Sequence, residues 1–357
     1  MSTRSTTRPA IVTARTHARI GLLGNPSDGY YGKVLALSLQ NFYAEVTLVP
    51  ADRISFQPHP VFDSNSFASL EELDRKVESE GFYGGVRLMM AAARRFFTYC
   101  REHSISLDGA RGFTMSYDNT VPRQSGLAGS SAIITAALTT LMRFFGVESD
   151  IPAQDRPGIV LGAEADLGIQ AGLQDRVIQA HGGVVFMDFE EAHMRRTGRG
   201  RYSRVDPASL PRLHVVWANS PSDSGRVHSG VRQRWLDGER EVHSGMAELA
   251  SLAQAGREAL QGGHPQRLGA LMDRNFDIRR QLFGAAALGE VNLGMIRLAR
   301  QHGLPAKFTG SGGAIVVLCE TDEALEALQG ACRDNQLSIE EVRIAPAICP
   351  LEGEEWD

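Results

Sequence analysis

A turn rich in glycine and serine leads directly into a long apolar segment, and this junction most constrains how the chain can fold. The turn spans Pro122–Ser131, and the segment from Ser130 to Phe145 contains no proline or glycine. The pattern predicts a buried helix that begins at the turn. Glycines let backbone N–H groups converge on an anion, and the helix N-terminus adds a favourable dipole. The junction is therefore a candidate phosphate site, with a serine-capped helix after a flexible loop as the structural alternative.

Helical and alternating apolar patterns both occur on either side of this turn. With 357 residues, of which 43% are hydrophobic, the chain can build two domains with substantial cores. We expect an α+β protein with a disordered N-terminal segment at 1–17, an N-terminal domain at 18–200 and a C-terminal domain at 201–357. The boundary is placed at Arg195–Arg204, whose five arginines and two glycines predict a solvated loop.

Charge and hydropathy exclude several classes of ligand. The net charge is -5, so no broad electrostatic attraction to nucleic acid or to an anionic membrane is expected. No apolar run reaches transmembrane length, and the start of the chain lacks the apolar core of a secretory signal. We therefore expect a cytoplasmic protein with a small-molecule ligand and no nucleic-acid or membrane partner. The oligomeric state does not follow from the sequence.

Two further glycine-containing motifs accompany the turn in a fixed order. The turn matches neither the G-x-x-x-x-G-K-[ST] nor the G-x-G-x-x-G pattern. Together with Ala18–Leu35 before it and Lys307–Ala314 after it, however, it resembles the three motifs of the GHMP kinases, such as galactokinase, homoserine kinase and mevalonate kinase. The resemblance implies the two-domain α+β GHMP kinase fold, with the active site in the interdomain cleft and with ATP and Mg²⁺ as cofactors.

The second and third motifs are the ones that the resemblance places around the phosphates of ATP. The third is the C-terminal glycine loop that closes over them in this family. The implied ATP-binding residues are Pro122, Gly126, Leu127, Ala128, Gly129, Ser130, Ser131, Gly310, Ser311, Gly312 and Gly313.

Two carboxylates between these motifs suit phosphoryl transfer, since one can ligate magnesium and the other can accept the proton of the attacking hydroxyl. In the family an acidic residue stands about eleven positions before the catalytic aspartate, and here 175 − 164 = 11. The match implies that Asp175 is the base and that Glu164 and Ser131 hold Mg²⁺. Arg19 matches the basic residue of the first motif and is a second catalytic candidate. For Glu164, a solvated helix position is the alternative.

The acceptor is indicated by a closer resemblance. The runs Gly24–Lys33, Val121–Leu127 and Gly172–Val177 resemble the glucuronokinases, which implies transfer of the ATP γ-phosphate to the anomeric hydroxyl of D-glucuronate. The products would be D-glucuronate 1-phosphate and ADP. The implied substrate-binding residues are Asn25, Asp28, Tyr31 and Arg123.

Some substrate assignments stay open at this point. Asp28 has the alternative role of a plain turn residue before Gly29. A uronate carboxylate calls for an arginine, and Arg123, Arg226 and Arg343 are candidates among which the sequence does not choose.

Two other functions also remain open. The same machinery could phosphorylate galacturonate, a heptose, a cyclitol or another sugar. Alternatively, the chain could be a catalytically inactive sugar-binding regulator, although the retention of Ser131, Glu164 and Asp175 argues against this.

Overall fold

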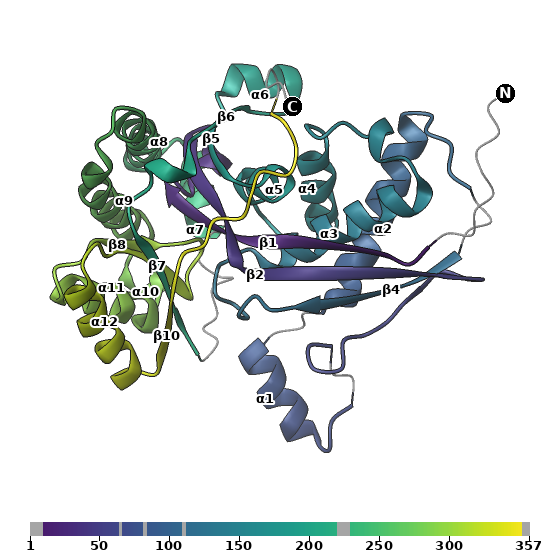
Figure 1. Cartoon of the computed structure of the whole chain (residues 1–357), viewed down its shortest axis with the longest axis horizontal. Coiled ribbons are helices and arrows are strands. Elements are labelled where there is room, and N and C mark those ends of the chain that lie inside the picture. Colours follow the sequence, from purple (N-terminus) through teal and green to yellow (C-terminus); the bar gives the residue numbers. More distant parts are fainter. Residues whose placement is uncertain (1–9, 64–65, 81–83, 109–111, 220–228, 352–357) are drawn as a thin grey trace.

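The computed structural model describes residues 10–63, 66–80, 84–108, 112–219 and 229–351, and it confirms the expected α+β class (Figure 1). Two sheets form its framework. The first contains β1 (Val12–Leu23), β2 (Lys33–Ala51), β3 (Ser55–Phe56), β4 (Gly112–Asn119), β5 (Val184–Asp188) and β6 (Arg201–Arg204). The second has the order β10-β7-β9-β8 and contains β7 (Leu213–Ala218), β8 (Ala306–Phe308), β9 (Ala314–Leu318) and β10 (Leu337–Glu341).

The long antiparallel hairpin of β1 and β2 organises the first sheet. β2 pairs with β1 along its length, with β5 through its first residues and with β4 through its last. Residues 12–17, which were expected to be disordered, form the start of β1. Burial alternates along this segment as it does in a strand with one covered face: Ala14 and Thr16 are buried, and Thr13 and Arg15 are exposed.

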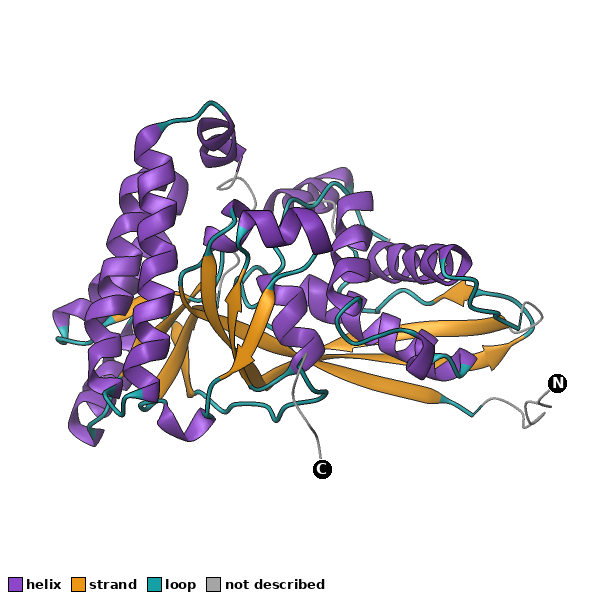
Figure 2. Cartoon of the chain, turned by 90° about the horizontal axis from the view of Figure 1, so that it is seen from above, coloured by secondary structure: helices purple, strands orange, loops and turns teal. Residues whose placement is uncertain are grey.

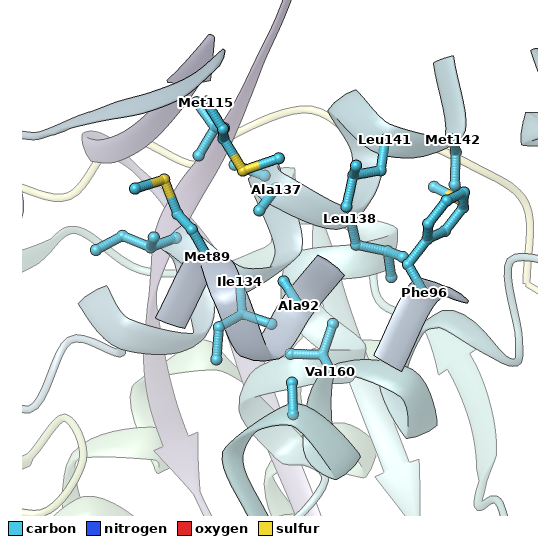
Figure 3. Packing of buried hydrophobic residues seen from close by; sticks show 14 of the residues in the cluster. Met89, Ala92, Phe96, Met115, Ile134, Ala137, Leu138, Leu141, Met142 and Val160 are labelled. Atoms are coloured by element: carbon cyan, nitrogen blue, oxygen red, sulfur yellow. The ribbon is translucent and has the colours of Figure 1, made fainter. Parts of the chain in front are cut away.

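The helices of the N-terminal half are α1 (Leu70–Glu80), α2 (Gly85–Glu102), α3 (Gly129–Phe145), α4 (Arg156–Asp166), α5 (Gln174–His181) and α6 (Glu191–Thr197). The helix α3 begins at the glycine turn, as the sequence predicts, and is buried along most of its length. It packs with α2, α4 and the strands β2 and β4 into one core. Phe96, Met115 and Leu138 belong to this core (Figure 3). The turn is thus fixed to a rigid element.

The helices of the C-terminal half are α7 (Ser229–Leu236), α8 (Arg240–Gln261), α9 (Leu268–Phe283), α10 (Ala285–Leu288), α11 (Glu290–Gln301) and α12 (Asp322–Asp334). The long helices α8 and α9 lie side by side (Figure 2). One core joins the two sheets through residues such as Ile20, Ala253 and Val316. Among the described residues, no helix is long and apolar enough to cross a membrane.

The first sheet extends beyond the predicted domain boundary at residue 200. The arginine-rich stretch is not simply a solvated loop, because α6 ends at Thr197 and β6 pairs with β5 in the register Val185↔Arg204. In addition, the segment after β10 returns to the first sheet. The N–H of Ala345 donates to the carbonyl of Ser38 at 2.9 Å, and that of Ile348 donates to the carbonyl of His181 at 2.8 Å.

Candidate active site

Arg19 lies where the predicted motifs meet. Its side chain extends from β1, is 5% exposed and donates to both carboxylate oxygens of Asp175, from Nε to Oδ1 at 2.5 Å and from Nη2 to Oδ2 at 2.8 Å. Its Nη1 donates to the carbonyl oxygen of Gly126 at 2.5 Å. A guanidinium that binds a carboxylate bidentately fixes the orientation of both groups. The structure therefore brings the two predicted catalytic residues and the phosphate turn together.

The second and third glycine motifs pack directly against each other. A Cβ atom at Gly126 would lie 2.3 Å from the carbonyl oxygen of Gly312, and one at Gly310 would lie 2.1 Å from the carbonyl oxygen of Gly126. A Cβ at Gly313 would lie 2.1 Å from the carbonyl oxygen of Gln124. No larger residue fits these positions without moving the backbone. The glycines thus allow two loops from different halves of the chain to share one site.

The start of α3 decides between the two interpretations of the turn. The N-cap residue is Ala128, which has a left-handed backbone with φ of 64° and whose own side chain forms no capping hydrogen bond. Ser131 lies inside the first turn, where its Oγ donates to the carbonyl of Ala128 at 3.2 Å. The alternative of a serine-capped helix is therefore wrong. A helix start beside a glycine turn is a favourable place for an anion.

Asp28 lies against the segment that carries Asp175. Its Oδ2 accepts from the N–H of Gln174 at 3.1 Å, and a Cβ at Gly172 would lie only 1.9 Å from this oxygen. Burial, and then the charge of Asp175, raise the pKa of Asp28 to about 6. Burial also acts to raise the pKa of Asp175, but Arg19 and Arg176 outweigh it and lower that pKa to about 2. The pKa values of these two neighbouring carboxyl groups are thus far apart.

Glu164 is 1% exposed on α4, so the alternative of a solvated helix position is wrong. Its carboxylate forms a buried ion pair with Arg176 of α5. Burial raises the pKa of Glu164, although the charge of Arg176 opposes this shift. The described residues contain no group of three or more His, Cys, Asp or Glu side chains that could enclose a metal. A carboxylate and a hydroxyl are oxygen donors of the kind that Mg²⁺ takes, usually one or two from the protein together with phosphates and water.

The four predicted substrate-binding residues lie in different surroundings. Asp28 is the one whose described contacts place it beside Asp175. Asn25 is buried and its Oδ1 accepts from Lys307 Nζ at 2.7 Å. Tyr31 is 42% exposed and lines a cavity of about 520 Å³ between its loop and α8. Arg123 lies 5.8 Å from the ring centroid of Phe62.

Of the other two arginine candidates for a substrate carboxylate, the structure describes only Arg343, and its surroundings do not support the assignment. Arg343 is 65% exposed and lies 4.0 Å from Glu340. Arg226 lies outside the described residues.

Several polar residues that support the site carry no motif signal. Asn275 Oδ1 accepts from the N–H of Gly24 at 2.7 Å, and Asn292 Oδ1 accepts from the N–H of Gly313 at 2.7 Å. Both stand in ordinary helical patterns, on α9 and α11. Lys307 stands inside the third motif, yet a lysine surrounded by apolar residues does not by itself reveal its partners. Its Nζ donates to the carbonyls of Gly21 and Phe308 as well as to Asn25.

Comparisons with known proteins agree with this geometry. The description "GHMP kinases N terminal domain" matches residues 87–183, and "GHMP kinases C terminal" matches residues 257–336. The chain is 49% identical to Glucuronokinase 1 of Arabidopsis thaliana, over 95% of this chain and 93% of that protein. It is 48% identical to Probable glucuronokinase 2 of the same plant, over 93% and 91% of the two chains.

A solved structure has a similar fold at low sequence identity. The Lin0012 protein of Listeria innocua matches 95% of this chain and 99% of its own, with a TM-score of 0.74 and 14% identity.

Proposed function

The chain belongs to the GHMP kinase family, and from this membership we propose that it transfers the γ-phosphate of ATP to the anomeric hydroxyl of D-glucuronate. The products are D-glucuronate 1-phosphate and ADP. One observation carries the choice of acceptor. The chain is 49% and 48% identical in sequence to two glucuronokinases, over more than nine tenths of its length. The geometry supports the type of reaction, since a carboxylate, a guanidinium and two glycine loops converge.

The acceptor hydroxyl loses its proton to Asp175 in this proposal. Asp175 stays ionised at neutral pH because its pKa is held at about 2. A weakly basic carboxylate suits a loose phosphoryl-transfer transition state, in which the proton leaves late and positioning matters most. Arg19 holds Asp175 in place through its two hydrogen bonds and brings a positive charge beside the turn. Asp28 is assigned to a second sugar hydroxyl.

The triphosphate lies between the turn at Pro122–Ser131 and the loop at Gly310–Gly313 in this proposal. Backbone N–H groups and the start of α3 supply the donors. Ser131 and Glu164 are the residues that would hold Mg²⁺, and the bound ion would neutralise charge on the β- and γ-phosphate oxygens. Arg176 already forms an ion pair with the Glu164 carboxylate, so a bound ion would share this carboxylate with Arg176.

An acceptor panel tests the proposal. ADP release would be measured with D-glucuronate, D-galacturonate, D-glucose and a heptose, and the phosphate position of the product would be read by NMR. We expect D-glucuronate to give the highest kcat/KM and a phosphate on the anomeric oxygen. Phosphate on any other oxygen, or a clear preference for another acceptor, would overturn the assignment. ATP binding without ADP release across the panel would identify an inactive regulator instead.

A further inference from the structure

Arg279, in the C-terminal half of α9, is a buried cation without a carboxylate partner among the described residues. Its side chain is among the largest fully buried ones and is 2% exposed as a residue. Its Nη2 donates to the carbonyl oxygen of Ser311 at 3.3 Å, whereas Nε is buried and has no hydrogen-bond partner. A buried charge with unsatisfied donors is costly, so its presence calls for an explanation.

Aromatic rings hold this guanidinium in one orientation. Its Cζ lies 5.2 Å from the ring centroid of Phe283 and 5.4 Å from that of Phe308. Such contacts stabilise the cation through the ring faces and leave its N–H edges for planar hydrogen bonding. Arg279 is therefore preorganised for an anion rather than flexible.

Its position connects it with the active site. Ser311, which accepts its hydrogen bond, belongs to the third glycine motif. Asn275 lies one turn earlier on the same face of α9 and holds the backbone of Gly24 in the first motif. Burial, reinforced by the charge of Arg19, lowers the pKa of Arg279 to about 10. Arg279 thus lies between the acceptor motif and the phosphate motif.

The other buried cations of this region already have their partners. Arg19 is paired with Asp175, and Arg176 with Glu164. Lys307 uses its three N–H donors on three oxygens. Within this group of four, Arg279 alone combines the lack of a carboxylate partner with a buried N–H donor that has no hydrogen-bond partner among the described residues. An anionic ligand would supply the missing charge.

We propose that Arg279 binds the carboxylate of the uronate acceptor and thereby selects a uronate over a neutral sugar. This inference rests on the proposed function, because it names the residue that recognises the charged part of that substrate. A guanidinium fork matches a carboxylate bidentately, and Nε is one edge of such a fork. A phosphate of ATP is the other anion within reach of the Ser311 loop, and the experiment separates the two.

The experiment compares Arg279→Gln and Arg279→Lys with the matched control Arg280→Gln, which removes the exposed neighbouring arginine. Kinetic constants are measured for D-glucuronate, D-glucose and ATP, and thermal unfolding is followed with and without D-glucuronate. In Arg279→Gln we expect kcat/KM for D-glucuronate, relative to D-glucose, to fall on the order of 100-fold, mainly through KM. The KM for ATP should change little.

Arg279→Lys should keep part of the preference, because it keeps the charge but not the fork. D-glucuronate should raise the unfolding temperature of the wild type and of Arg280→Gln but not of Arg279→Gln. If Arg279→Gln does not fold, full retention of the preference by folded Arg279→Lys, at unchanged KM for D-glucuronate, overturns the inference. Equal losses for both sugars, or a raised KM for ATP instead, also overturn it. A wild type that fails to phosphorylate D-glucuronate contradicts the proposed function, which is a separate result.

Discussion

Arg19 and Asp175 form a bidentate pair with hydrogen bonds of 2.5 and 2.8 Å, although 156 residues separate them in the chain. The pair joins β1 to α5. The remaining nitrogen of the same guanidinium, Nη1, donates to the carbonyl of Gly126 in the glycine turn. A change in either residue therefore alters both chemistry and structure, and tests of the site have to measure the two separately.

Asp175→Asn is expected to lower kcat by about 10²–10⁴-fold, because the amide cannot accept the acceptor's proton. It also leaves the buried Arg19 without its counter-charge, so the free energy of unfolding should fall by about 3–5 kcal/mol. Steady-state kinetics and chemical denaturation would measure the two effects. Asp166→Asn is the matched control: this aspartate pairs with Arg94 and Arg95 on the surface, and its loss should leave kcat unchanged. Near-normal kcat in folded Asp175→Asn would contradict the base assignment.

Asp28→Asn is expected to stabilise the protein without ligand at neutral pH. The folded-state pKa is raised from 3.8 to about 6, so the folded state binds more protons than the unfolded one between these values. Stability contributed by this group is therefore lost as pH rises through that window, by at most about 3 kcal/mol. The variant should show this gain at pH 7 and none below about pH 4, by denaturation at several pH values. A gain that does not depend on pH would contradict the shift.

The same group should affect catalysis in the opposite direction. If ionised Asp28 accepts a hydrogen bond from the sugar, kcat/KM for the acceptor should fall as pH drops below about 6. In Asp28→Asn the pH profile of kcat/KM should lack this inflection, and kcat/KM should be low at every pH. An unchanged inflection in the variant would assign it to another group.

Gly310→Ala is expected to separate the two glycine loops. The new Cβ would meet the carbonyl of Gly126 at 2.1 Å and the guanidinium of Arg19 at 2.8 Å. Such overpacking typically costs about 1–3 kcal/mol, and we expect a raised KM for ATP as well. Gly158→Ala on α4 is the control, since nothing lies within 4 Å of its Cβ position and alanine favours helix. Unaltered ATP kinetics in a folded Gly310→Ala would argue against a phosphate role for this loop.

Ser131→Ala is expected to raise the Mg²⁺ concentration needed for half-maximal activity about tenfold or more, if its hydroxyl is a ligand. Stability should change little, because among the described residues the partner of this hydroxyl is the carbonyl of Ala128 in its own turn. Thr139→Ala on the same helix removes a similar hydroxyl, which donates to Thr135, and should leave the Mg²⁺ requirement unchanged. A Mg²⁺ titration at fixed ATP measures the difference. An equal requirement in both variants would remove Ser131 from the metal site.

The parts of the fold that follow local patterns could be predicted from the sequence. The buried helix predicted to begin at the glycine turn is observed as α3 (Gly129–Phe145), because a long apolar run without internal proline or glycine marks it in the sequence. The arginine-rich stretch near residue 200 was misjudged, since β6 pairs with a strand that precedes it and its four residues show little alternation of their own. The strand with which a short segment pairs cannot be read from the residues of that segment alone.

The site divides in the same way. Motif residues such as Arg19 and Asp175 could be proposed because their motifs resemble those of a known family, and the structure brings the two residues together. Arg279 could not be found, because one arginine in a helix that contains several looks like any solvated position. Its burial depends on two phenylalanines and on a loop 32 residues away in sequence. Only tertiary packing distinguishes it from its exposed neighbour Arg280.

The return of the segment after β10 to the first sheet has a consequence for how the protein is made. The hydrogen bonds from Ala345 to Ser38 and from Ile348 to His181 can form only after almost the whole chain has left the ribosome. The N-terminal half therefore contains the glycine turn at Pro122–Ser131 long before these late contacts are made. Nascent chains halted near residue 200 should be bound by chaperones and cleaved by proteases, and kinase competence should arise in one late step of synthesis.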